Sequence, residues 1–97
     1  MKHIIAHLNK AFESRVRLGI MSVLMVNESI DFKSLKAMLE VSDGNLASHI
    51  GALEKLEYIE VRKQFIGKRP NTSYSVTTSG ELAFKAHLNA LEKLLGK

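Results

Sequence analysis

The first 56 residues place hydrophobic side chains three or four positions apart, the spacing of one face of an α-helix. This spacing predicts a short helix within residues 1–12, a second over 14–26, a third over 32–40 and a fourth over 42–56. Asp31 directly precedes the third of these helices, and Ser42 is the first residue of the fourth. Their side-chain oxygens suit N-caps, because they accept hydrogen bonds from free N–H groups of the first turn. Residues 32–56 are therefore expected to form two helices joined by a tight turn.

From Tyr58 the spacing of hydrophobic residues changes to two, which is typical of a β-strand with one solvated face. Residues 67–71 read Gly-Lys-Arg-Pro-Asn and include the only proline of the chain. This composition favours a turn. Tyr74 and Val76 then resume the alternation. The pattern predicts a β-hairpin with a basic tip over residues 58–76.

A C-terminal helix is predicted over residues 78–95. Thr78 and Glu81 have the spacing of a capping box, which marks a helix N-terminus. A hydrophobic stripe follows at helical spacing and consists of Phe84, Leu88, Leu91 and Leu95.

These elements predict one domain over residues 1–97, mainly α with a small β-hairpin, in the α+β class. The order is that of a winged helix-turn-helix, with four to five helices and a wing of two or three strands. Residues 32–56 are the helix-turn-helix and 58–76 the wing. There is no internal repeat and no low-complexity linker.

Composition adds little to this picture, whereas the placement of charge adds much. The chain has 45% hydrophobic and 25% charged residues, no cysteine and a formal net charge of +4. Residues 61–80 hold no acidic residue but four basic ones, and the rest of the chain is formally neutral. A solvated charge run is the simpler reading. Its position on a hairpin favours contact with the phosphate backbone or minor groove of DNA.

The predicted helix over 42–56 suits the major groove, which is about 12 Å wide. Leu46, Ile50 and Leu53 face its own core, and the opposite face carries short polar side chains. Asn45 can pair with adenine, Ser48 with several bases or a phosphate, and His49 with guanine or a phosphate. Asp43 would stabilise the helix N-terminus or accept a hydrogen bond from the amino group of cytosine. Gly44 would let the backbone approach DNA closely.

Four segments carry a family resemblance: residues 42–50 (SDGNLASHI), 53–56 (LEKL), 68–72 (KRPNT) and 76–80 (VTTSG). Together they resemble the small stand-alone winged-helix transcriptional regulators of the MarR/ArsR-like superfamily. The resemblance implies a dimeric DNA-binding regulator whose wing arginine contacts DNA. Glu57 stands where similar proteins commonly have glycine, so the helix is expected to end without a left-handed cap. The chain also lacks the extra helices of typical MarR-like proteins, so no effector pocket is implied.

The predicted function is that of a sequence-specific regulator that binds double-stranded DNA. The helix over 42–56 would enter the major groove, and the wing over 62–73 would follow the backbone or minor groove. The predicted DNA-binding residues are Ser42, Gly44, Asn45, Ser48, His49, Lys55, Arg62, Lys63, Lys68, Arg69 and Thr72.

A homodimer is predicted from hydrophobic residues that a small core leaves over: Phe84, Leu88, Leu91, Leu94 and Leu95, with Ile4, Ile5 and Leu8. The helices over 1–12 and 78–95 would then form the interface, unless they only close the core of the monomer. A two-fold dimer would place two recognition helices about 34 Å apart on a palindrome-like site.

Other functions stay open. A winged helix without DNA binding can serve as a protein-interaction module. A metal-responsive DNA-binding sensor is a further alternative, because the chain contains His3, His7 and His87. Surface histidines without a metal are the simpler interpretation, and no metal site is predicted. An enzyme is not expected, because Ser48 and His49 would point about 100° apart on a helix. No cofactor and no membrane span are expected, and the protein is expected in the cytoplasm. The sequence leaves any effector and the operator open.

Overall fold

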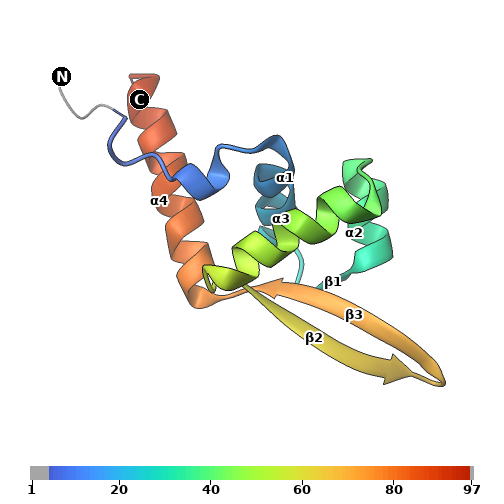
Figure 1. Cartoon of the computed structure of the whole chain (residues 1–97). Helices are drawn as coiled ribbons and strands as arrows, with labels where there is room; N and C mark the ends of the chain where they lie inside the picture. The colour runs from blue at the N-terminus through green and yellow to red at the C-terminus, as the bar shows by residue number, and fades with distance from the viewer. Residues whose placement is uncertain (1–4, 97) are drawn as a thin grey trace.

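Residues 5–96 are described by a computed structural model, in which four α-helices accompany a three-stranded antiparallel sheet. In Figure 1 the helices within residues 15–55 lie above the sheet, a long hairpin projects from one end, and the C-terminal helix lies at the other. The predicted winged helix-turn-helix is confirmed. The elements in chain order are a 3-10 helix at Lys10–Phe12, α1 Arg15–Met25, β1 Ile30–Asp31, α2 Phe32–Leu39, α3 Asp43–Lys55, β2 Ile59–Ile66, β3 Arg69–Val76 and α4 Thr78–Leu94.

The N-terminal segment differs from the expected α-helix. Its described part forms turns over residues 5–8 and then a single 3-10 turn. Asn9 explains the difference, because its backbone is extended and its side chain accepts the N–H of Ala11. Asn9 also donates its backbone N–H to Nδ1 of His87 at 3.0 Å and its amide to the Tyr58 hydroxyl at 3.1 Å. These tertiary bonds hold the segment against α4 and override the helical pattern.

The helix-turn-helix follows the predicted boundaries closely. Asp31 caps α2 by accepting the N–H of Ser34, and Ser42 caps α3 by accepting the N–H of Asn45 at 3.1 Å. α2 ends at Leu39, because its C-cap Glu40 has a positive φ of 53° that stops the helix. Both predicted caps are confirmed.

The end of α3 corrects the expectation for Glu57. This residue has a φ of 64°, so it adopts the left-handed backbone that glycine usually supplies. Its N–H donates to the carbonyl of Glu54, and the N–H of Tyr58 donates to the carbonyl of Leu53 at 3.0 Å. This pair of bonds is a Schellman motif. A left-handed cap therefore forms without glycine, and it turns the chain from α3 into β2.

The sheet has the order β1-β3-β2, so the short β1 adds a third strand to the hairpin. β1 reaches only Tyr74 and Ser73 of β3, and β2 pairs with β3 from Ile59↔Val76 to Ile66↔Arg69. The hairpin turn is therefore Gly67-Lys68 alone, tighter than the expected 67–71. Pro70 lies within β3, beyond the end of β1. Among residues 5–96 no strand pairs with that edge of β3, so the missing N–H breaks no ladder there.

α4 begins one residue earlier than the predicted capping box implies. The N-cap is Thr77, not Thr78, and its hydroxyl accepts the N–H of Gly80 at 2.9 Å. Gly80 is required here, because a Cβ would lie 2.0 Å from the carbonyl oxygen of Tyr58. The buried face carries Gly80, Phe84, His87 and Ala90. The predicted stripe is thus split: Phe84 is buried, while Leu88, Leu91 and Leu95 are exposed.

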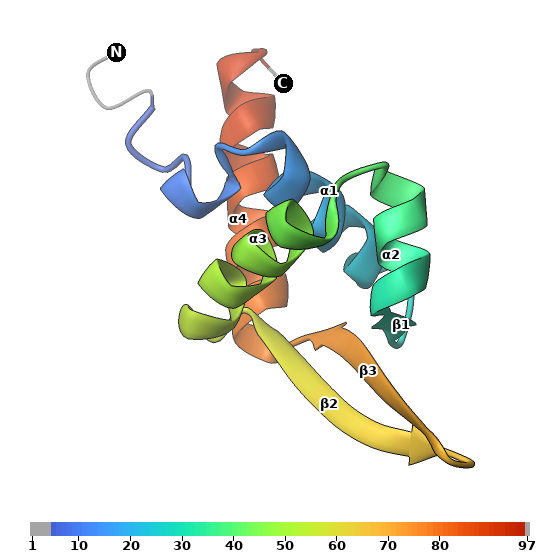
Figure 2. The same cartoon turned by 45° about the vertical axis from the view of Figure 1, so that its right-hand side comes forward.

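Phe12 stands at the junction of the N-terminal segment, α4 and the end of α3. It is 1% exposed, and its ring centroid lies 5.2–5.5 Å from those of Tyr58, Phe84 and His87. The rest of the core lies between α1, α2, α3 and one face of the sheet. The radius of gyration is 14.7 Å, above the roughly 13 Å of a compact chain of this size. The hairpin and α4 account for the excess, because both project from the body in the two views (Figures 1 and 2).

Candidate nucleic-acid interface

The outward face of α3 is nearly free of bulky side chains. Gly44, Ser48, Gly51 and Lys55 follow one another at steps of four, three and four, so they share one exposed face opposite the buried Leu46, Ile50 and Leu53. A Cβ built at Gly44 or Gly51 meets nothing within 4 Å. The fold therefore does not need these glycines for packing. Their effect is a smooth helix surface that another molecule can approach closely.

The N-terminus of α3 carries its own charge balance. Asp43 in the first turn pairs with Lys36 of α2, with 2.7 Å between Oδ1 and Nζ. The pair is exposed and therefore weak, but it places a cation beside the carboxylate that would otherwise face DNA phosphates alone. Asn45 is exposed one turn from Ser48 and lines a hollow of about 410 Å³ with Arg15 of α1. Neither Arg15 nor Lys36 is among the DNA-binding residues predicted from the sequence.

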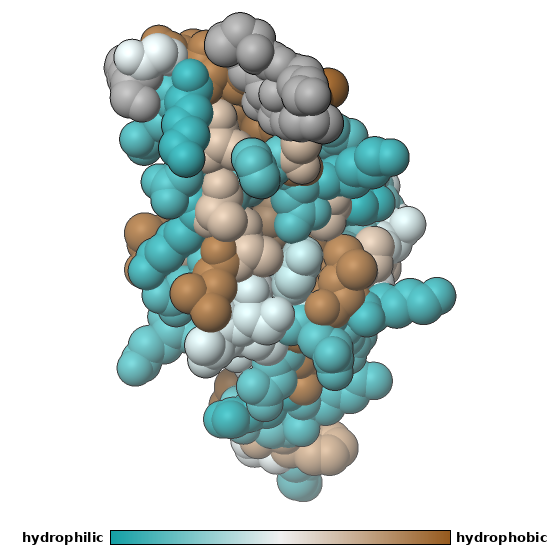
Figure 3. All heavy atoms as spheres, turned by 90° about the vertical axis from the view of Figure 1, so that its left-hand side faces the viewer, coloured by the Kyte–Doolittle hydropathy of each residue, from teal (hydrophilic) through white to brown (hydrophobic). Residues whose placement is uncertain are grey.

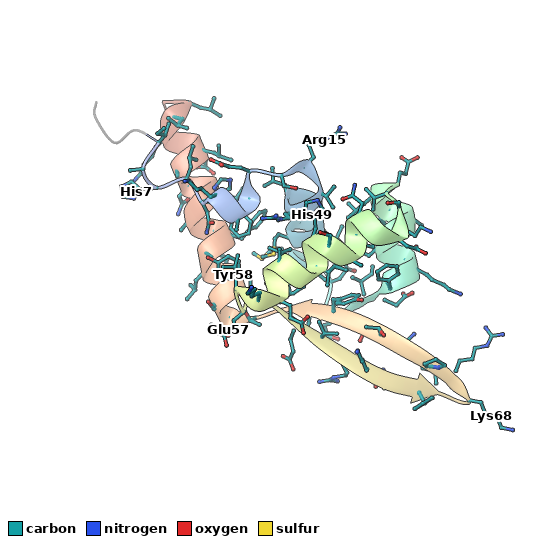
Figure 4. The ribbon with its side chains drawn as sticks, viewed as in Figure 1. His7, Arg15, His49, Glu57, Tyr58 and Lys68 are labelled. Carbon is teal, nitrogen blue, oxygen red and sulfur yellow. The ribbon has the colours of Figure 1, made fainter. Side chains whose placement is uncertain are left out.

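His49 is less available than its place on the helix suggested. Its Nδ1 accepts a hydrogen bond from Nε of Arg17 at 3.0 Å, and its side chain is half-buried between α3 and α1 (Figure 4). Arg17 also reaches the carbonyl of Ala11. The ring therefore links α3 to α1, and only Nε2 is left to donate to a partner. No spacing rule connects residues 17 and 49, so the sequence offered no signal for this pair.

The wing separates its cations between two faces. Residues paired across the strands share a face, so Lys63 lies with Thr72, whereas Arg62 and Arg69 lie on the other face. The Lys63 face continues the side of the sheet that packs on the helices through Ile59 and Tyr74. Lys68 sits in the turn, at the far end of the hairpin (Figure 4).

All four wing cations are exposed. Within residues 5–96 the ion pairs are Lys36 with Asp43 and Lys85 with Glu81, and neither involves the wing. The wing cations therefore face solvent without a carboxylate partner among the described residues. Arg69 lines a hollow of about 490 Å³ between β3 and the start of α2, where Lys33 adds a further cation. Asp31 lines the same hollow, so its lining carries charges of both signs.

The sequence raised His3, His7 and His87 as candidates for a metal-responsive sensor. His3 lies outside the described residues, and His87 is buried with Nδ1 bound to the backbone of Asn9. In residues 5–96 no three His, Cys, Asp or Glu side chains are placed to hold an ion together. None of the helices in that range is both long and apolar enough to span a bilayer.

A recognition helix with a smooth outward face, set beside a basic two-stranded hairpin, defines a winged-helix module of the DNA-binding kind. The chain matches the family of winged helix DNA-binding domains over residues 16–95, and it belongs to that family. The resemblance expected from the sequence is confirmed.

The chain is also similar to individual proteins. A transcriptional regulator homologue from Pyrococcus horikoshii has a solved structure with 31% identity and a TM-score of 0.82, and the match covers 98% of this chain and 92% of that one. An uncharacterized protein of Methanocaldococcus jannaschii is 35% identical over 85 residues, or 88% of this chain and 92% of its own length. A MarR structure shares the fold with 20% identity and a TM-score of 0.75. That match covers 93% of this chain and 65% of MarR.

Proposed function

We propose that the protein is a transcriptional regulator that binds specific double-stranded DNA sites, with α3 in the major groove and the wing on the adjacent backbone or minor groove. The observation that carries the proposal is the smooth face of α3 beside a wing that holds the whole formal charge excess. As a regulator that reaches chromosomal DNA, it would act in the cytoplasm. It needs no catalytic group.

Along α3 we assign base reading to Asn45 and Ser48, because both are exposed and short enough for base edges. Ser42, Gly44 and the free N–H groups of the first turn would bind a phosphate, and Lys55 a second one at the other end of the helix. His49 takes a smaller part than the sequence suggested. With Nδ1 held by Arg17, it would orient α3 against α1 and offer only Nε2 to DNA.

On the wing, Lys63 and Thr72 would contact one strand of the duplex backbone, and Arg62 and Arg69 would contact the other. This division follows from their opposite faces on the hairpin, which allow it to sit between two phosphate backbones. Lys68 in the turn would contact a further phosphate at the far end of the wing.

We further propose a homodimer through the leucine stripe of α4, which we define as Leu88, Leu91 and Leu95, together with Ile5 of the N-terminal segment. These side chains are exposed. The side of the molecule that carries α4 shows hydrophobic groups among hydrophilic ones (Figure 3). Two-fold pairing would cover them and set two α3 helices about one helical turn of DNA apart.

The test is a titration of labelled duplexes at several salt concentrations. Each lost phosphate contact makes the negative slope of log K against log salt shallower by about 1. Lys68→Ala and Arg69→Ala should each cause this change, on all sequences alike. Asn45→Ala with Ser48→Ala should alter sequence preference and leave the slope unchanged.

Lys85→Ala is the matched control, because it removes the same charge from α4, where Lys85 pairs with Glu81. Equal losses from Lys85→Ala and Lys68→Ala would refute the wing assignment. No binding of the wild type at low salt would refute the DNA proposal and favour a protein-interaction module.

A further inference from the structure

The free end of the wing carries two large hydrophobic side chains in solvent. Phe65 is 73% exposed and Ile66 is 62% exposed. The opposite end of the same strand begins with Ile59, which is 3% exposed and belongs to the core. Neither Phe65 nor Ile66 packs against that core, and β1 ends before reaching this part of β3. The aromatic ring of Phe65 is therefore not part of the core of the described fold.

Phe65 of β2 pairs with Pro70 of β3 directly across the hairpin. Ile66 and Arg69 close the two-residue turn as a hydrogen-bonded pair, so Phe65 and Pro70 form the following pair without mutual hydrogen bonds, in which side chains lie closest. The two rings thus make a small apolar unit on one face of the hairpin. Its flanks are cationic: Lys63 is the preceding residue on the same face and Lys68 lies in the turn.

The surroundings of this apolar unit indicate the chemistry of its partner. With no carboxylate between residues 61 and 80, the positive charge around Phe65 attracts a polyanion. A flat aromatic ring among these charges also requires an apolar surface to cover it. Duplex DNA offers both, because phosphates line a groove whose floor is the edge of stacked bases. Apolar side chains inserted there unstack a base step and bend the duplex.

We propose that Phe65, supported by Pro70, inserts at a base step where the wing enters the minor groove, and that this insertion bends the DNA. This inference rests on the proposed function. Lys63 and Lys68 would hold the two flanking phosphates, and Phe65 would fill the opened step. Easily unstacked pyrimidine–purine steps would then be preferred beneath the wing, although no side chain there reads a base edge.

The experiment compares wild type, Phe65→Ala and Ile66→Ala on an end-labelled duplex of about 30 base pairs rich in TpA steps, which kink easily. Energy transfer between the ends reports the bend, and 2-aminopurine beside a TpA step reports unstacking. Phe65→Ala should weaken binding about tenfold, remove the bend and the 2-aminopurine signal, and leave the salt slope unchanged, because no charge is lost. Ile66→Ala removes a similar exposed side chain from the opposite face and should retain the bend.

The outcomes separate the two proposals. If the wild type fails to bind any duplex at low salt, the proposed function fails. If the wild type binds and Phe65→Ala binds and bends DNA equally well, only the insertion is overturned. A tenfold loss of affinity with an unchanged bend also overturns it, because Phe65 would then lie on the outer surface of the duplex. A third arm uses anionic lipid vesicles: binding that depends on Phe65 there, with DNA bending unaffected, would assign the tip to a membrane instead. Unchanged circular dichroism of both variants verifies folding.

Discussion

At the scale of single residues, Glu57 holds a backbone conformation that an L-residue with a Cβ adopts at a cost of about 1–2 kcal/mol. Its side chain is exposed, so glycine would remove this cost without loss of packing. We predict that Glu57→Gly raises the free energy of unfolding by about 1 kcal/mol, with part of the gain offset by the flexibility of glycine in the unfolded chain. Urea denaturation measures the change.

Glu54→Gly is the control for Glu57→Gly, because residue 54 lies within the helix. It should lower the free energy of unfolding by about 1 kcal/mol. A loss of stability from both variants would mean that the side chain of Glu57 matters more than its backbone.

Gly80 presents the opposite case, in which glycine is required by a neighbour. A Cβ at this position would lie 2.0 Å from the carbonyl oxygen of Tyr58, which also accepts the N–H of Thr77 at 3.0 Å and therefore cannot withdraw freely. We predict that Gly80→Ala lowers the free energy of unfolding by about 3 kcal/mol. Thermal melting of Gly51→Ala serves as the comparison. That change should raise stability by about 0.5–1 kcal/mol, because alanine is the better helix former and the site is open. Similar melting temperatures for the two variants would contradict this account.

At the scale of elements, the cap of α2 depends on pH. The hydrogen bond from the Ser34 hydroxyl lowers the pKa of Asp31 below its usual 3.8. The ionised form is therefore the one that stabilises the folded chain. Its contribution is present above the usual pKa and is lost as pH falls through the lowered one. We predict that Asp31→Ala costs about 1 kcal/mol at neutral pH and that the difference from wild type narrows below about pH 4.

Asp31→Asn separates charge from capping, since asparagine also caps helices but does not titrate. Its stability relative to Asp31→Ala should stay constant with pH. The measurement is chemical denaturation of the three proteins across the acid range. A difference between wild type and Asp31→Ala that persists at the lowest pH would exclude the carboxylate as the cause.

The N-terminal segment is an element that tertiary contacts alone hold in place. Phe12 supplies its main anchor, among Tyr58, Phe84 and His87. We predict that Phe12→Ala lowers the free energy of unfolding by about 3–5 kcal/mol, because it leaves a cavity in the core. Amide exchange at Asn9, whose N–H donates to His87, should accelerate more than exchange in the helices. Lys10→Ala, at an exposed position of the same segment, should change neither quantity. A uniform acceleration of exchange throughout the chain would count against local release of the segment.

At the scale of the whole molecule, the leucine stripe of α4 is the surface proposed for the dimer. We predict that the wild type sediments as a dimer, that Leu88→Glu with Leu91→Glu sediments as a monomer, and that the double variant binds a palindromic duplex more weakly. Leu82→Glu is the control: Leu82 is also exposed but lies on a different face of α4, so the dimer should persist. A monomeric wild type at all concentrations would refute the proposal.

The position of the excess positive charge on the wing was predicted from the sequence. The chain outside residues 61–80 is formally neutral, so the whole formal excess lies on the hairpin once the hairpin forms. That Arg62 and Arg69 share one face of the hairpin was not predicted from the sequence. It depends on the register of β2 against β3, which the two-residue turn at Gly67-Lys68 sets.

Local chemistry explains which features of this protein the sequence by itself determined. The caps at Asp31 and Ser42, the helical spacing of α1 to α3 and the alternation that marks the wing depend on residues a few positions apart, and all were confirmed. Tertiary structure decided the remaining features, because each of them depends on residues that lie far apart in the chain. Asn9 donates hydrogen bonds to His87 and Tyr58, and Arg17 donates one to Nδ1 of His49. The carbonyl oxygen of Tyr58 lies so close to position 80 that only glycine fits there. The choice of the buried face of α4 has the same origin: His87 lies inward because the N-terminal segment supplies its partner, and the leucines beside it are left in solvent.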